Sequence, residues 1–184
     1  MNYHDIFWKV KHQAFYITVI AMISAVAIVG RSVFTFLPNV KPITVIFLMV
    51  TVIFGLVSGL LVMFVTIVAT SIQHGFGIWV AHQLIAYAIL LGITRALWRR
   101  TSLTHPQKFP FIIWCGIVGY LYGILMTIAH AVTVQLANPF PYYLNGLWFD
   151  TYHAFGNIGF AIILVPVLTP ILTKIRTQLL ARSA

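Results

Sequence analysis

Long apolar segments follow one another along almost the whole chain, separated by short groups of polar residues. A helix that spans a membrane needs about 20 mainly apolar residues. Segments close to this length predict helices over roughly 14–30, 79–97, 111–137 and 151–175. The pattern therefore predicts one all-α integral membrane domain covering residues 1–184.

The apolar stretch between Pro42 and Ile72 is ambiguous. As one helix it would be about 45 Å long, too long for a hydrocarbon core of roughly 30 Å without strong tilt. A division near Gly55–Gly59 gives two helices, the first of them unusually short.

The distribution of cations favours the divided form. With six transmembrane helices, nine of the eleven Lys and Arg residues lie on one side: Lys9, Lys11, Arg95, Arg99, Arg100, Lys108, Lys174, Arg176 and Arg182. The positive-inside rule then places both termini in the cytoplasm.

Composition restricts the possible functions. Only 7% of the residues are charged, against about 25% in soluble domains, and the net charge of +9 is explained by topology rather than by nucleic-acid binding. The single cysteine, Cys115, excludes a disulfide framework and a thiolate metal cluster. No G-x-x-x-x-G-K sequence is present, so the chain has no ATPase site of this type. We expect neither a catalytic site nor a metal site.

The first predicted outer loop, 31–41, holds the two remaining cations, Arg31 and Lys41, with Asn39 between two prolines. These cations are typical either of side chains that reach lipid phosphates or of a site that meets an anionic ligand group or Asp150.

The second outer loop, 71–78, contains Gln73 and His74 and leads to Trp79 and Gln83. A tryptophan at this place is also typical of a membrane-interface anchor, and Gln83 would serve an interhelical hydrogen bond as well as a ligand.

The third outer loop, 138–150, contains Asn145 and Trp148 and ends at Asp150. Asp150 either caps the last helix or begins a polar stripe with His153 and Asn157 on the same helical face. Polar residues are costly in lipid, so we expect this stripe to face the interior of the bundle.

Small residues at a spacing of four predict close helix approach at Ala21/Ala25, Gly55/Gly59 and Gly119/Gly123. Together with the outer polar loops, these features resemble the S-component of an energy-coupling factor (ECF) vitamin transporter over nearly the whole chain. The resemblance implies that Ala21 and Ala25 dock on the shared membrane coupling subunit.

Three segments are similar to the cobalamin branch of that family: Gly30-Arg31…Pro38-Asn39-Val40-Lys41-Pro42, Gly75-x-Gly77-x-Trp79-x-x-x-Gln83 and Phe149-Asp150-x-x-His153-Ala154-x-Gly156-Asn157. Phe76, Ile78 and His82 depart from the pattern expected in the middle segment.

The resemblance implies an S-component-like fold in the bacterial cell membrane and a vitamin, cobalamin, bound in a wide outer cavity. It implies a coupling subunit and two cytoplasmic ATPases as partners, and no cofactor of the chain's own. The expected substrate-binding residues are Arg31, Asn39, Lys41, Gln73, His74, Trp79, Gln83, Asn145, Trp148, Asp150, His153 and Asn157.

Alternatives remain open at this point. One is an S-component for another vitamin, such as pantothenate. Another is a haem-binding membrane cytochrome subunit, since His82, His130 and His153 lie in or beside predicted helices. A membrane enzyme using Asp150 and His153 is disfavoured because no second acid, thiol nucleophile or metal set accompanies them.

Overall fold

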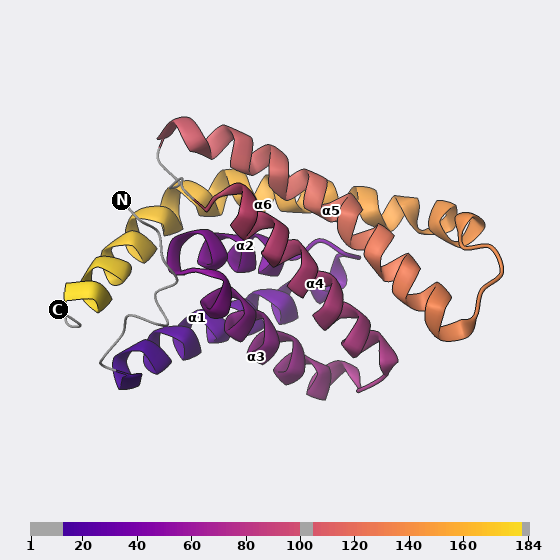
Figure 1. Ribbon diagram of the computed structural model, residues 1–184, viewed down its shortest axis with the longest axis horizontal. Coiled ribbons are helices and arrows are strands. Elements are labelled where there is room, and N and C mark those ends of the chain that lie inside the picture. The colour runs from indigo at the N-terminus through magenta and orange to yellow at the C-terminus, as the bar shows by residue number, and fades with distance from the viewer. Residues whose placement is uncertain (1–12, 100–104, 182–184) are drawn as a thin grey trace.

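The computed structural model describes residues 13–99 and 105–181, all of whose regular structure is helical (Figure 1). The cations Lys9, Lys11, Arg100 and Arg182 of the predicted topology lie outside these residues. The helices are α1 (Gln13–Val33), the short 3-10 helix η2 (Phe34–Phe36), α2 (Ile43–Phe54), α3 (Leu56–His74), α4 (Ile78–Leu97), α5 (His105–Val134) and α6 (Phe140–Ala181).

Five of these helices are long and apolar enough to cross a membrane, as expected for a multi-pass membrane protein. The exception is α2, which has 12 residues and is therefore only about 18 Å long. The predicted division of the long apolar stretch is confirmed at Gly55, whose φ of 113° is accessible to glycine and ends one helix before the next begins.

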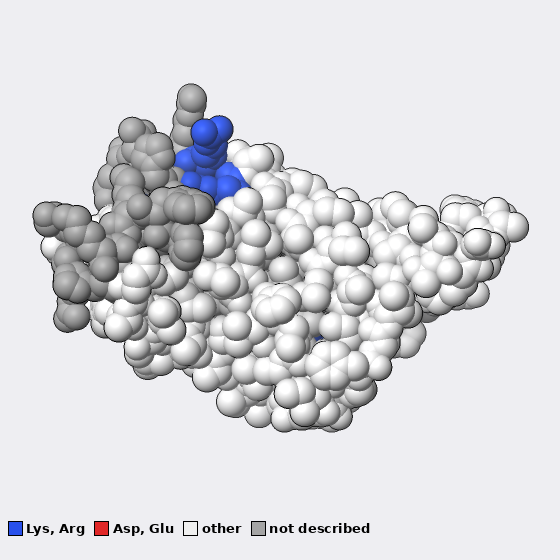
Figure 2. All heavy atoms as spheres, turned by 60° about the horizontal axis from the view of Figure 1, so that its bottom comes forward, with Lys and Arg blue, Asp and Glu red and all other residues white. Residues whose placement is uncertain are grey.

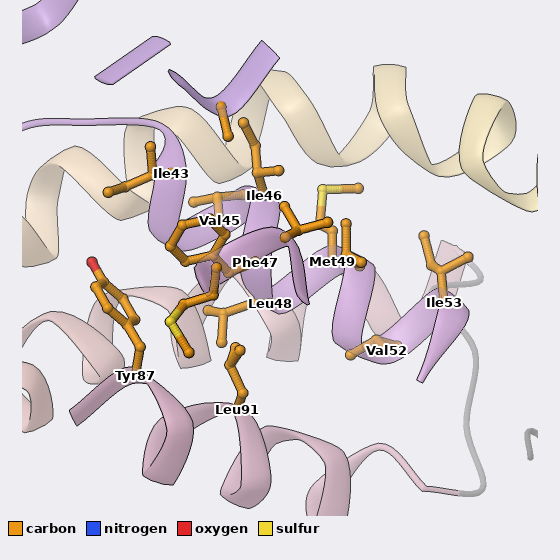
Figure 3. Close-up of a cluster of buried hydrophobic side chains, with 14 of the residues drawn as sticks. Ile43, Val45, Ile46, Phe47, Leu48, Met49, Val52, Ile53, Tyr87 and Leu91 are labelled. Atoms are coloured by element: carbon orange, nitrogen blue, oxygen red, sulfur yellow. The ribbon is translucent and has the colours of Figure 1, made fainter. Parts of the chain in front are cut away.

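Every residue of α2 is buried. A helix that is apolar on all sides has no preferred outward face, so it is stable where other helices enclose it. Figure 3 shows its side chains pointing in all directions from the helix axis, with Phe47 near Tyr87 of α4. The Phe47 and Tyr87 rings meet edge to face, with centroids 5.3 Å apart. This short helix is the centre of the core.

The helices run back and forth along one direction (Figure 1). The start of α1, the end of α4, the start of α5 and the end of α6 lie at the left end of that view, while α5 and α6 project together at the right. Figure 2 shows one face of the molecule, on which Lys and Arg atoms gather in one group and almost all the other described surface is uncharged.

The predicted close approach at Gly119 and Gly123 is confirmed between α5 and α6. A Cβ at Gly119 would lie 2.6 Å from the Ala154 backbone, and one at Gly123 would overlap the Asp150 carboxylate. At the other pair, a Cβ at Gly59 would overlap the Thr51 side chain, so α3 packs closely on α2 there. At all three positions a larger residue would displace its neighbour, and at Gly119 the displaced atoms are backbone atoms of α6.

The prediction that residues 138–150 form a loop is wrong, because α6 begins at Phe140. The Asn138 side-chain oxygen accepts a hydrogen bond from the Phe140 N–H at 3.0 Å, which satisfies a free donor of the first turn. Pro141 is tolerated in that turn because its missing N–H needs no partner there. Asp150 therefore lies inside α6 and does not cap it.

With 42 residues, α6 is about 63 Å long, more than a hydrocarbon core of roughly 30 Å requires. It contains Pro166 and Pro170, residues that kink helices because each removes a backbone hydrogen bond. The C-terminal part of α6 turns away from the rest of the helix in Figure 1.

Candidate functional site

A small polar cavity lies where α1, α2, α4, α5 and α6 meet the segment that joins α1 to α2. Its volume is about 40 Å³. We call it the polar cavity; its lining residues are Arg31, Asn39, Lys41, Ile43, Thr44, Gln83, Tyr87, Tyr122 and His153. Five of the predicted substrate-binding residues are thus brought together: Arg31, Asn39, Lys41, Gln83 and His153.

The segment between α1 and α2 is held against α6. Asn39 adopts a positive φ of 61° and donates a hydrogen bond from Nδ2 to the Phe149 carbonyl at 2.9 Å. Val40 lies over Gly156, where a Cβ would come within 3.0 Å of its side chain. Two segments far apart in the sequence, 30–42 and 149–157, therefore meet at the cavity.

Arg31 is buried, with an exposed fraction of 5%. Its Nη2 donates to the Gln83 Oε1 at 3.2 Å, which links the end of α1 to α4. Its Nε and Nη1 atoms are buried and have no hydrogen-bond partner. A guanidinium carries five N–H donors, so most of the donor capacity of this side chain is unused.

Lys41 lines the same cavity and is half-buried. Burial and, to a smaller extent, the positive charge of Arg31 lower the pKa of the Lys41 ammonium from its usual range. Two cations therefore share one small space, and Arg31 disfavours the charged form of Lys41.

The predicted ion pair between Asp150 and Arg31 or Lys41 is wrong. Among the described residues, neither cation forms an ion pair with Asp150, and Asp150 does not line the polar cavity. Its carboxylate lies instead against Gly123 of α5. The reason is the longer α6, which places Asp150 at the α5–α6 interface rather than in a loop that could reach the cations.

Hydroxyl groups that the sequence analysis did not single out complete the lining. The Thr44 hydroxyl lies 2.9 Å from both the Tyr87 hydroxyl and the His153 Nε2. The His153 ring packs edge to face on Tyr122, with centroids 5.1 Å apart, and its Nδ1 has no partner. Tyr87 could have been identified from its position four residues after Gln83, on the same helical face.

The other predicted site residues do not line the polar cavity. Asn157 is fully buried and donates to the Cys115 carbonyl at 3.1 Å, so it joins α6 to α5. Trp79 is partly buried and packs on the apolar core. The remaining three, Gln73, Asn145 and Trp148, are exposed. The Gln73 side-chain oxygen accepts a hydrogen bond from the Ser32 hydroxyl. The side chain of His74 lies outside what the structure describes.

A second hollow lies between α4 and α5. Its volume is about 290 Å³. We call it the apolar groove, and its lining residues are His82, Ile85, Ala86, Ile89, Leu125, Ile128, Ala129, Val132 and Thr133. Its polar contact is between the His82 Nε2 and the Thr133 hydroxyl, 2.8 Å apart.

The sizes of the two hollows limit what each can hold. Pockets for drug-sized ligands measure about 300–1,000 Å³, so the polar cavity accommodates a group of a few atoms and no whole vitamin. This differs from the wide outer cavity expected from the family resemblance. No protein-family model matches the chain, and no curated protein or solved structure was found to be similar to it.

Proposed function

We propose that this chain is the substrate-binding membrane subunit of an ECF vitamin importer of the bacterial plasma membrane, with cobalamin as its solute. The observation that carries the proposal is the meeting of segments 30–42 and 149–157 with Gln83 at one polar cavity. These are parts of the three segments on which the family resemblance rests. Polar groups are costly inside a membrane and are typical of solute pathways when they converge.

The topology we propose has six spans and both termini in the cytoplasm. The arrangement of helix ends in Figure 1 is consistent with it, because the ends of α1, α4, α5 and α6 nearest the cation-rich segments lie together. Arg95 lies in the last turn of α4, and Lys108 lies near the start of α5. The polar cavity lies toward the other end of α1, since Arg31 is in its last turn.

Capture of a vitamin at this site requires the outer elements to move apart, because the cavity is small. The contact to be opened is that between the 34–41 segment and α6. Asn39 makes its hydrogen bond there to the Phe149 carbonyl, and Val40 rests on Gly156. Phe149 itself is exposed, so this contact lies at the surface and is accessible to an arriving solute.

Docking on the coupling subunit is proposed for the outward face of α1. Ala21 and Ala25 are exposed on this helix, and Met22 and Val29 beside them are also exposed. Two small residues one turn apart allow another helix to approach closely. The chain would depend on two separate cytoplasmic ATPases for transport.

The structure offers less support to a haem-binding subunit. His82 lines the apolar groove, His153 lines the polar cavity, and His130 stacks on Tyr142 with ring centroids 4.7 Å apart. Ligation of one haem by two imidazoles requires two of these rings to face a common space. They occupy three different surroundings.

The test is titration of the purified protein, in detergent, against a panel of vitamins by calorimetry, with the absorption spectrum recorded before titration. We expect saturable binding of cobalamin and no binding of pantothenate. Saturable binding of a different vitamin would move the chain to another branch of the family. A haem Soret band in the purified protein, or no binding of any vitamin, would contradict the proposal.

A further inference from the structure

The polar cavity contains positive charge that no lining residue neutralises. Arg31 is 5% exposed, Lys41 is half-buried beside it, and no residue that lines the cavity is acidic. A buried charge without a counter-charge is costly, and proteins normally compensate it with a partner. An unpaired guanidinium in a cavity is therefore a reason to look for a ligand.

The free hydrogen-bonding groups define the ligand's chemistry. The Nε and Nη1 groups of Arg31 donate hydrogen bonds and cannot accept them, and the same holds for the ammonium of Lys41. The side-chain oxygen of Gln83 already accepts from Arg31. What the cavity offers is mainly donors and positive charge, so its ligand must accept hydrogen bonds and be negative.

The geometry of the guanidinium narrows the choice of ligand further. The Nε–H and Nη1–H groups of Arg31 point to different sides of the guanidinium. Two oxygens of one carboxylate or phosphate therefore bind side by side to one of these groups together with the second N–H of Nη2. A cavity needs at least about 10–15 Å³ to hold one water molecule, so a cavity of about 40 Å³ holds only a compact group of a few atoms. A carboxylate is of this size.

We propose that the polar cavity is a binding site for one compact oxyanion group, a carboxylate or a phosphate, held by Arg31 with Lys41 as the second cation. The group belongs either to a free small anion or to the captured solute, and only the second source rests on the proposed function. The anion neutralises the repulsion between the two cations and links α1 and α4 to the segment before α2. Because these elements surround the cavity, its occupation stabilises the closed arrangement of the outer end.

The test compares acetate with acetamide, a neutral molecule of nearly the same shape, as additives to the purified protein at constant ionic strength. The added salt is balanced with a bulky sulfonate. Above its dissociation constant, we expect each tenfold increase in acetate to raise the melting temperature by about 3–5 °C. Acetamide should have no effect. Equal effects of acetate and acetamide would overturn the proposal.

Two variants test whether the response to acetate arises at the polar cavity. Arg31→Gln should lose the response to acetate, whereas Lys174→Gln, which removes an exposed cation of α6, should keep it. If Arg31→Gln does not fold, Arg31→Lys replaces it, because lysine keeps the charge but lacks the planar fork. Acetate should then bind at least tenfold more weakly. An unchanged acetate response in either Arg31 variant would contradict the site.

A final measurement assigns the source of the anion, by repeating the acetate series with saturating cobalamin. If the solute supplies the anionic group, the acetate response disappears and acetate lowers the apparent affinity for cobalamin. If the increases in melting temperature caused by acetate and by cobalamin add, the site takes a free anion. The acetate series contains no vitamin, so it remains informative if the protein does not bind cobalamin at all.

Discussion

The two sides of α5 differ in how closely they are packed. Toward α6, a Cβ at Gly116, Gly119 or Gly123 would lie within 3.0 Å of an atom of that helix, and at Gly119 that atom belongs to the backbone. Toward α4, the apolar groove measures about 290 Å³ and is lined by aliphatic side chains, several of them exposed, such as Ile89 and Ile128. The polar cavity, lined on this side by Tyr122 of α5 and His153 of α6, is only about 40 Å³ in volume.

Under the proposed function the smaller of the two hollows is the binding site, so volume alone would select the wrong one. The apolar groove is built by two neighbouring helices, and side chains of this kind are what a helix exposes to lipid. The polar cavity needs side chains from five helices and from one connecting segment, and its contacts join residues up to 110 positions apart in the chain. Polar groups do not converge in this way without cost, since each loses water or lipid headgroup contacts.

The largest effect is expected from adding a side chain on the face of α5 that packs against α6. Gly119→Val would place carbon atoms within the van der Waals distance of the Ala154 backbone, so α5 and α6 would have to separate. We expect a loss of about 3 kcal/mol or more in the free energy of unfolding. The measurement is thermal unfolding of the purified variant.

The matched control is Gly92→Val in α4, where a Cβ would meet nothing within 4 Å. The same substitution there should change stability by less than about 0.5 kcal/mol. Equal losses at Gly92 and Gly119 would mean that the two sides of α5 are not packed differently.

An intermediate effect is expected on solute binding. Gln83→Ala removes the acceptor that holds Arg31 in place and should weaken binding of the solute by about 5- to 150-fold, equivalent to about 1–3 kcal/mol. Ile89→Ala, in the apolar groove, should leave the affinity within about twofold of the native value. Calorimetric titration of both variants provides the comparison, and a larger loss for Ile89→Ala would place the site in the groove.

The smallest effect is expected at the polar end of the groove. Thr133→Val removes the hydroxyl 2.8 Å from the His82 Nε2 and should lower stability by about 0.6 kcal/mol, the average for hydrogen bonds between membrane helices. Thr177→Val is the control, since its hydroxyl bonds only the Thr173 carbonyl of its own helix. Solute affinity should not change in either variant. A change in affinity for Thr133→Val would show that the two hollows are coupled.

Much of the fold could be predicted because it follows from lengths and spacings. The break at Gly55 follows from the thickness of a bilayer, and the close approach at Gly119 follows from two small residues on one face. The start of α6 could not be predicted in this way. Asn138, Pro141 and Gly146 are typical of turns in sequence, and only the capping bond at Asn138 and the helix-compatible place of Pro141 reveal a helix.

The polar cavity was predictable only in part. Arg31, Lys41 and Gln83 could be expected to meet because the topology predicted from the sequence places them at one end of the bundle. The position of Asp150 depends on where α6 begins, so its distance from the cations could not be derived from spacing. Thr44 and Tyr122 lie within apolar helices, where hydroxyl residues are common, and only the three-dimensional contacts of Thr44 distinguish it.

The enclosed position of α2 has a consequence for how the protein is made. α2 contacts α1, α3, α4, α5 and α6, so its surroundings include the last helix of the described chain. Ribosomal synthesis proceeds from the N-terminus, and α2 therefore leaves the ribosome long before its neighbours exist. At about 18 Å it is also shorter than the hydrocarbon core, and Gly55 joins it directly to α3. We expect α2 and α3 to enter the membrane together as a hairpin, and the centre of the molecule to be the last part to reach its final environment.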